Sequence, residues 1–323
     1  MELVNIKDIE EFYRTGKRAD NDALNRLRER AFLILNDPQH PYFRDAVYGE
    51  KWRKLLNGLN AFIKNELELK KLPFEQFTFT IESRGGLSNH FDLFIRVHNL
   101  TDISFEFKFK SMPQFANYQE SHGYIQKSLP EMWYNGPLKD ICALYTDLKI
   151  PLPDFESYNI GCRQFLNGNS KDSFYKQFRA YDQKTNPIYK KKEVITATGI
   201  KKYLLENANT FNIVKLKKKL LEDQTGKVYG IWNPLTASFK RYEIKSEELK
   251  PTSVYGVKDN HLYLTTESKD TMLDLYLRWK NTNGICNPMW QISLKSTNKL
   301  PKGITFLNNI PHTNSTINII SHS

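Results

Sequence analysis

Two short segments largely alternate between apolar and polar side chains, and this alternation constrains the fold more than any other feature of the sequence. Residues 90–97 read His-Phe-Asp-Leu-Phe-Ile-Arg-Val, and residues 102–110 read Asp-Ile-Ser-Phe-Glu-Phe-Lys-Phe-Lys. Successive side chains of a β-strand point to opposite faces, so the phenylalanines of the second segment share one face while Glu106 and Lys108 share the other. The connection between the segments is short and contains Asn99, which predicts a β-hairpin.

Pairing of these strands brings Asp92 near Glu106, with Lys108 two residues further along the same face. Two carboxylates on adjacent strands suit Mg²⁺, which binds one or two carboxylates together with waters and substrate phosphate. Such an ion lowers the pKa of a bound water and neutralises charge that develops on a phosphoryl group. A lysine beside it can orient or deprotonate the attacking water, or stabilise the charged transition state. The alternative reading is a surface hairpin whose polar face is only solvated.

The order of these residues resembles the signature of the PD-(D/E)XK nuclease superfamily, which includes most type II restriction endonucleases. Asp92 matches the acidic residue of its first motif, and Glu-Phe-Lys at 106–108 matches its second. Residues 84–90 resemble the glycine-containing entry to the first motif, although Phe91 stands where many members have proline. The resemblance implies an α/β (α+β) restriction-endonuclease-like core, with a central mixed sheet flanked by helices, and Mg²⁺ held by the two carboxylates.

Helical and strand patterns surround the hairpin. Residues 20–35 and 48–69 carry apolar side chains at helical spacing, and Gly58 within the second segment allows close packing against the sheet. Residues 77–82 alternate as Phe-Thr-Phe-Thr-Ile-Glu, which predicts the first strand of a three-stranded meander.

Two further candidate catalytic residues follow from the resemblance. A helix that precedes the sheet in this family often contributes a glutamate to the metal site, and Glu50 is the candidate by position, with Glu66 and Glu82 as alternatives. Pro113 suits the first turn of a helix, which we expect over residues 113–128. Gln114 on this helix resembles a glutamine that follows Glu-x-Lys in the recombination nucleases of the superfamily and contacts the cleaved strand.

Charge and cysteine content limit the kind of partner and the cellular compartment that we expect for this chain. The chain has 323 residues, a net charge of +11 and a pI of about 9.3, which favours a polyanionic partner, although a lysine-rich composition alone gives the same excess. Three isolated cysteines form neither a disulfide framework nor a zinc motif. Without a signal peptide or an apolar run of membrane length, we expect a cytoplasmic protein in a reducing compartment, with no membrane partner.

The C-terminal region contains side chains that suit DNA recognition. We expect a helix over residues 269–280, then a turn and a strand over residues 289–295. Arg, Lys, Asn and Gln read base edges, and this segment concentrates them. The candidate DNA-binding residues are Arg278, Lys280, Asn281, Asn283 and Gln291, with Arg84 and Lys110 beside the hairpin. Packing of a C-terminal core explains the apolar residues of the same segment.

Together these patterns predict an N-terminal helical segment (1–37), a nuclease core (38–183) and a C-terminal region that completes the fold and contacts DNA (184–323). The function expected is Mg²⁺-dependent hydrolysis of double-stranded DNA by a type II restriction endonuclease-like homodimer. The alternatives are a structure-specific or repair nuclease of the same superfamily, a DNA-binding protein without catalysis, and an interaction protein with a lysine-rich surface.

Overall fold

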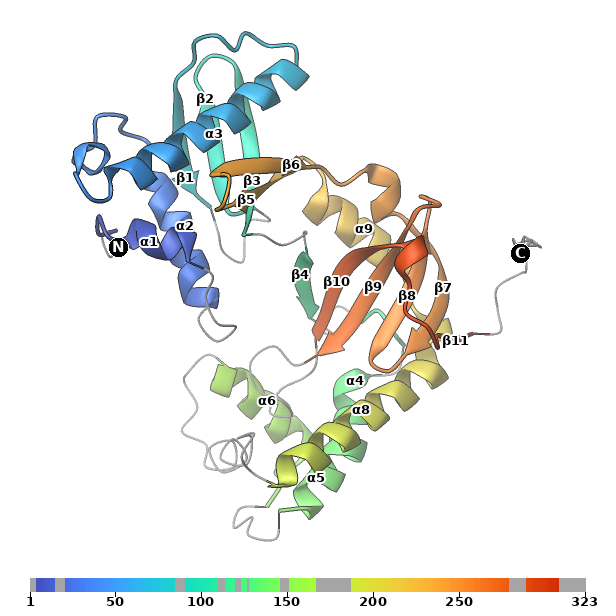
Figure 1. Ribbon diagram of the computed structural model, residues 1–323. Helices are drawn as coiled ribbons and strands as arrows, with labels where there is room; N and C mark the ends of the chain where they lie inside the picture. The colour runs from blue at the N-terminus through green and yellow to red at the C-terminus, as the bar shows by residue number, and fades with distance from the viewer. Residues whose placement is uncertain are drawn as a thin grey trace, which may run out of the picture. The chain divides into compact units, whose positions relative to one another are not determined.

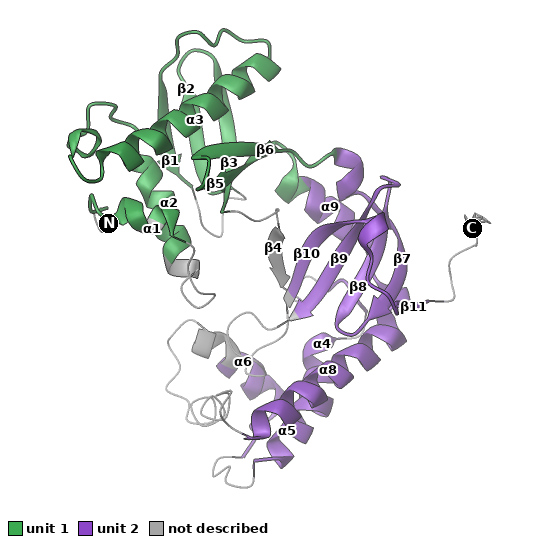
Figure 2. Cartoon of the chain, in the orientation of Figure 1, with its two compact units in different colours: residues 1–113, 222–245 green, residues 114–221, 246–323 purple. Residues whose placement is uncertain are grey.

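The chain folds into two compact units (Figure 2). Unit 1 comprises residues 1–113 and 222–245, and unit 2 comprises residues 114–221 and 246–323. A computed structural model describes residues 4–14, 21–84, 91–109, 114–119, 123–126, 128–145, 151–166, 187–278 and 289–307. Each unit is α/β in character, and each is built around its own sheet.

Unit 1 contains helices that precede a five-stranded mixed sheet (Figure 1). The helices are α1 (Asp8–Tyr13), α2 (Asn21–Ile34), a 3-10 turn (Pro41–Arg44) and α3 (Gly49–Leu69). The strands are β1 (Phe79–Ser83), β2 (Leu93–Val97), β3 (Thr101–Phe109), β5 (Lys227–Asn233) and β6 (Ser238–Tyr242), in the order β1-β2-β3-β5-β6. Neighbours are antiparallel except β3 and β5, which are parallel. The expected helices and the meander at the start of this sheet are confirmed.

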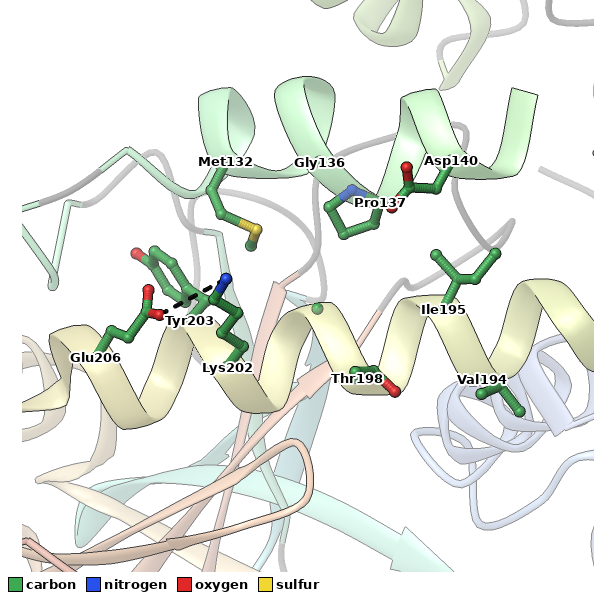
Figure 3. Close-up of a pocket in the computed structure, with 11 residues that line it drawn as sticks. Met132, Gly136, Pro137, Asp140, Val194, Ile195, Thr198, Lys202, Tyr203 and Glu206 are labelled. Atoms are coloured by element: carbon green, nitrogen blue, oxygen red, sulfur yellow. Dashed lines mark ion pairs between the residues drawn. The ribbon is translucent and has the colours of Figure 1, made fainter. Parts of the chain in front are cut away.

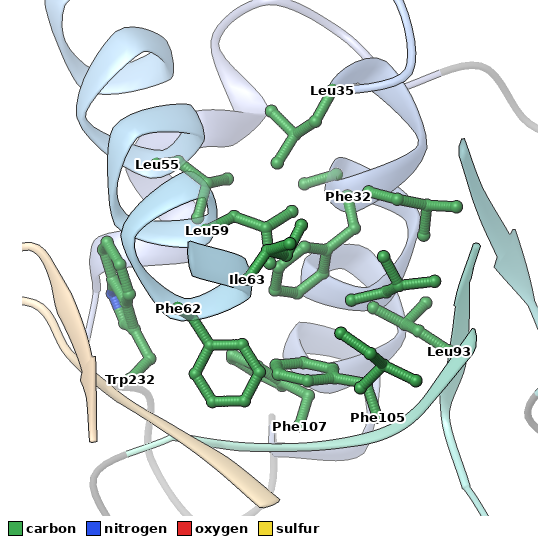
Figure 4. Close-up of a cluster of buried hydrophobic side chains, with 14 of the residues drawn as sticks. Phe32, Leu35, Leu55, Leu59, Phe62, Ile63, Leu93, Phe105, Phe107 and Trp232 are labelled. Carbon is green, nitrogen blue, oxygen red and sulfur yellow. The ribbon is translucent and has the colours of Figure 1, made fainter. Parts of the chain in front are cut away.

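One face of the unit 1 sheet forms the core (Figure 4). Phe105 and Phe107 of β3 are buried with Leu93 of β2, whereas their neighbours Ser104 and Glu106 are only partly buried. Residues of α2 and α3, with Leu35 just after α2, close the core from the other side, and those labelled are Phe32, Leu35, Leu55, Leu59, Phe62 and Ile63. Apolar burial on one face therefore fixes the strand register, since a shift by one residue would expose every phenylalanine. The polar face of β3, which carries Glu106 and Lys108, does not contribute to this core.

Gly58 lies where α3 approaches the sheet most closely. A Cβ atom at this position would lie 2.8 Å from the carbonyl oxygen of Ala237 and 2.9 Å from the Trp232 ring. The close packing expected of this glycine is confirmed, and any side chain would push the helix away from β5 and β6.

Unit 2 is built on a six-stranded antiparallel sheet with the order β11-β7-β8-β9-β10-β4. Its strands are β4 (Gln114–Gln119), β7 (Pro251–Lys258), β8 (His261–Thr266), β9 (Thr271–Arg278), β10 (Met289–Ser296) and β11 (Thr305–Phe306). Its α-helices are α4 (Leu129–Trp133), α5 (Lys139–Ala143), α6 (Phe155–Leu166), α8 (Pro187–Asn207) and α9 (Ile213–Gln224), and the boundary at residue 221 falls within α9. A π-helical turn (Tyr134–Leu138) joins α4 to α5, and short 3-10 turns occur at Ala208–Thr210, Ser246–Leu249 and Thr297–Lys299. Trp290 of β10 packs edge-on against Phe211, with ring centroids 5.9 Å apart.

Two expected helices are wrong. Residues 114–119 form β4, which pairs with β10 across a long separation in sequence, and such distant pairing has no local signature. Residues 271–278 form β9 rather than a helix. Here Leu273, Leu275 and Leu277 alternate with period two and are all buried, so the strand pattern prevails over the helix propensity of leucine and methionine.

The two units also divide the chain differently from the expected boundaries at residues 37/38 and 183/184. The N-terminal helices belong to the same core as the hairpin, because Phe12 and Phe32 are buried against Phe107. The strands β5 and β6 complete the unit 1 sheet although most of unit 2 lies between them and β3 in sequence. Among the residues described, no helix is both long and apolar enough to cross a membrane.

Candidate functional site

The hairpin places Asp92 directly across from Glu106. Asp92 lies one residue before β2, and the pairing of Leu93 with Phe105, extended by one residue, sets Asp92 opposite Glu106. The Asp92 N–H donates to the carbonyl oxygen of Phe105 (3.2 Å), and the Phe107 N–H donates to Asp92 Oδ2 (2.9 Å). The Arg84 N–H donates to the carbonyl oxygen of Asp92 (2.9 Å). Backbone bonds to both neighbouring strands therefore hold the Asp92 carboxylate in place.

Two lysines bind the Glu106 carboxylate, one at each oxygen. Lys108 Nζ lies 2.6 Å from Oε1, and Lys227 Nζ lies 3.3 Å from Oε2. Lys108 is two residues further along β3, so its side chain shares the face of Glu106. Lys227 is the first residue of β5, the parallel neighbour of β3. The sequence pattern predicted Lys108 beside Glu106, but it gave no sign of Lys227, which is 121 residues from Glu106 in the chain.

Glu29 of α2 is a third acidic residue of this cluster. The pKa of Glu29 is raised to about 7, first by burial and then by the charges of Asp92 and Glu106, while Lys108 opposes the rise. This glutamate lies on α2 and was not among the glutamates expected from the sequence, of which Glu50 and Glu66 lie on α3. Helical spacing placed the neighbouring apolar residues correctly, but nothing in the sequence showed which end of the sheet α2 would meet.

The pKa shifts in this cluster come first from burial and then from the neighbouring charges. The pKa of Asp92 is raised to about 6 by burial and by the Glu106 charge, while Lys108, the Phe107 N–H and Lys227 oppose the rise. Burial lowers the pKa of Lys108, but Glu106 and Asp92 outweigh it and keep that pKa above its ordinary value. Burial also lowers the pKa of Lys227, and this effect exceeds the opposing effect of Glu106. Perturbed groups clustered in this way are typical of functional sites.

Asp92 and Glu106 fit the coordination habits of Mg²⁺. This ion is usually held by one or two carboxylates together with waters and phosphate. The Glu106 charge contributes to the raised pKa of Asp92, and a divalent cation between the two facing carboxylates would relieve this repulsion. The described residues contain no group of three or more His, Cys, Asp or Glu side chains arranged to hold a metal, so any such ion would rely on waters and substrate for its remaining ligands.

The three other glutamates considered have different surroundings. Glu50, the first choice by position, is exposed and pairs with Lys54 at 2.7 Å, one helical turn away. Glu66 is buried and pairs with Arg241 of β6. Glu82 pairs with Arg84, whose guanidinium also lies 5.7 Å from the Phe94 ring centroid. The contacts described for these glutamates involve none of Asp92, Glu106 and Lys108.

The candidates for DNA contact are spread over both units. Arg84 is partly exposed at the end of β1. Gln114 begins β4, not a helix, and belongs to unit 2, whereas Asp92, Glu106 and Lys108 belong to unit 1. Arg278 ends β9 opposite Met289, and Gln291 of β10 pairs with Tyr276. Lys110, Lys280, Asn281 and Asn283 lie outside the described residues.

Unit 2 contains a pocket of about 450 Å³ between α8 and the segment from α4 to α5 (Figure 3). Met132, Pro137 and Tyr203 line it together with the ion pair of Lys202 and Glu206, whose atoms are 3.9 Å apart. Lys202 is largely exposed, so this pair contributes little. The pocket offers apolar volume, whereas the Asp92 cluster offers paired acids and bases.

Comparison with protein-family models, with curated proteins and with solved structures found no match to this chain.

Proposed function

We propose that this chain is a Mg²⁺-dependent nuclease that hydrolyses phosphodiester bonds in double-stranded DNA, in the manner of type II restriction endonucleases. The observation that carries the proposal is the placement of Asp92 opposite Glu106, with Lys108 bound to Glu106 at 2.6 Å on the same face. A mixed sheet preceded by helices, with the acidic residue and Glu-x-Lys on adjacent strands, supports a restriction-endonuclease-like core.

In this proposal Asp92 and Glu106 would hold Mg²⁺, which lowers the pKa of a bound water and neutralises phosphoryl charge when bound. The Phe107 N–H keeps Asp92 Oδ2 directed at the site. Lys108 is mostly buried, with 23% of its side chain exposed, and its positive charge would orient the attacking water and stabilise the pentavalent phosphoryl group. Glu29 accepts or releases a proton near neutral pH, as its pKa of about 7 allows.

The net charge of +11 supports a polyanionic substrate, because neutralisation of phosphates provides most of the affinity for DNA. Phosphate contacts carry no sequence information, so base choice would come from the C-terminal candidates such as Arg278 and Gln291. A cytoplasmic homodimer completes the proposal, because most members of the resembled superfamily cut both strands as homodimers.

The test is incubation of the purified protein with plasmid DNA and Mg²⁺, with EDTA as the control. Discrete fragments support a restriction enzyme, and a smear supports a less specific or structure-directed nuclease. Asp92→Asn should abolish cleavage. Asp102→Asn is the matched control, because Asp102 lies in the same hairpin, on β3, but is exposed and pairs with Arg96 at 3.6 Å. Intact plasmid under all conditions, or equal cleavage by both variants, would rule out the proposed site, and binding without cleavage would favour a non-catalytic DNA-binding protein.

A further inference from the structure

The two lysines on Glu106 differ in how firmly they are held. Lys108 leaves 23% of its side chain exposed, whereas Lys227 leaves 6%. Lys108 binds Oε1 and Lys227 binds Oε2, so each oxygen of this carboxylate has its own cation. A cation that binds Glu106 therefore meets one of these two ammonium groups at the oxygen that it uses.

Lys227 is fixed by its surroundings in β5. Its Nζ lies 5.3 Å from the ring centroid of Tyr229, which is 1% exposed. The Tyr229 hydroxyl donates to Gln224 Oε1 at 2.5 Å, and Gln224 is itself buried. The parallel ladder pairs Lys227 with Ser104 and Tyr229 with Glu106, so Lys227 reaches Glu106 along the diagonal between the strands. This environment gives the ammonium group little room to move.

We propose that Lys227 is a positioning residue that anchors Glu106 by Oε2, so that Oε1 is the only oxygen for which Lys108 and a divalent cation compete. The inference rests on the proposed function. Its basis is geometric: a buried lysine on one oxygen and a more exposed lysine on the other. The fixed charge of Lys227 also repels a cation at this site, so it weakens cation binding while it holds the carboxylate in a productive orientation.

This division of roles predicts opposite effects on binding and on cleavage. Lys227→Met removes the repelling charge, so Mn²⁺, used as the probe, should bind several-fold more tightly by isothermal titration calorimetry. The same variant should cleave plasmid DNA roughly 10- to 100-fold more slowly, because partners that orient metal ligands typically have effects of this size. Lys227→Arg keeps charge and donor, so it should restore most of the cleavage rate and the native Mn²⁺ affinity.

Lys240→Met is the matched control, because Lys240 lies on β6, next to β5, and is exposed. It should change neither Mn²⁺ affinity nor cleavage. A merely structural role for Lys227 would lower both properties together with the melting temperature, and that result would overturn the inference, as would no change in either. If Lys227→Met does not fold, Lys227→Gln compared with Lys227→Arg provides the same test, since only the arginine retains the charge. A native protein that neither binds Mn²⁺ nor cleaves DNA would instead contradict the proposed function itself.

Discussion

Each of the two sheets contains a carboxylate flanked by two basic side chains, but the balance of charge differs. In unit 2, Asp274 Oδ1 of β9 lies 2.6 Å from His261 Nδ1 of β8, and Asp274 pairs with Lys295 of β10 at 3.8 Å. In unit 1, Glu106 has Lys108 and Lys227 in the same roles, with two further carboxylates nearby.

The two clusters differ in the number of carboxylates that share the two basic side chains. Asp274 links three adjacent strands, and one carboxylate with two basic partners needs no ligand to complete it. The unit 1 cluster holds three carboxylates and two lysines, and burial, with the mutual repulsion of the carboxylates as a smaller cause, raises the pKa of Asp92 to about 6 and that of Glu29 to about 7. Native folds retain such unfavourable charge chiefly where function requires it.

The largest expected effect is on the rate of DNA cleavage, which a substitution in the unit 1 cluster should lower and a substitution in the unit 2 cluster should not. Lys108→Ala should slow DNA cleavage by roughly 10²–10⁴-fold, because it removes the group that stabilises charge at the phosphoryl centre. DNA binding, measured by electrophoretic mobility shift, should change little, since one lysine contributes a small part of many phosphate contacts. Lys295→Ala, the corresponding lysine beside Asp274, should retain cleavage; equal loss in both variants would remove the distinction.

Asp92→Asn should stabilise the protein in the absence of divalent cations. Because the folded-state pKa of Asp92, about 6, exceeds the ordinary 3.8, its contribution to stability is complete below pH 4 and is lost as the pH rises through 6. The asparagine variant avoids this loss, so its free energy of unfolding at pH 8 should exceed that of the native protein by about 1–3 kcal/mol. Chemical denaturation at pH 8 with EDTA measures the difference, and a destabilised variant would show that Asp92 is a structural carboxylate.

Asp274→Asn should act in the opposite direction. It removes the charge that joins three strands of unit 2 and should lower the free energy of unfolding by about 1–2 kcal/mol, a value reduced because His261 and Lys295 are partly exposed. Chemical denaturation monitored by tryptophan fluorescence measures the change in the free energy of unfolding. Stabilisation by this variant would mean that the two clusters do not differ in the way proposed.

The smallest effect concerns Glu29. Its folded-state pKa of about 7 exceeds the ordinary 4.5, so the stability associated with its proton is lost as the pH rises through 7. Glu29→Gln should therefore make the decline in melting temperature between pH 5 and pH 8 shallower. Glu50→Gln is the control, because Glu50 is exposed and pairs only one turn away, and it should leave both this profile and DNA cleavage unchanged. An unchanged profile in Glu29→Gln would place Glu29 outside the cluster.

Local sequence patterns determined the hairpin and the order of its site residues. Strict alternation in residues 102–110 set Glu106 and Lys108 on the face opposite Phe105 and Phe107, because exposure of the phenylalanines would be costly. The helical spacing around Gly58 likewise determined α3 and its close approach to the sheet. These features depend on neighbours within a few residues, so the sequence alone displays them.

Only the tertiary structure decided which distant residues join the site. Lys227 meets Glu106 because β5 returns beside β3 in parallel, and the charge of Asp92 acts on Glu29 because α2 packs against the sheet, not because of any local pattern. The same limit explains the wrong helix at residues 113–128, since β4 exists only through its pairing with β10. Side-chain periodicity encodes which face of an element is buried, whereas the partner of that face is chosen by packing across the whole chain.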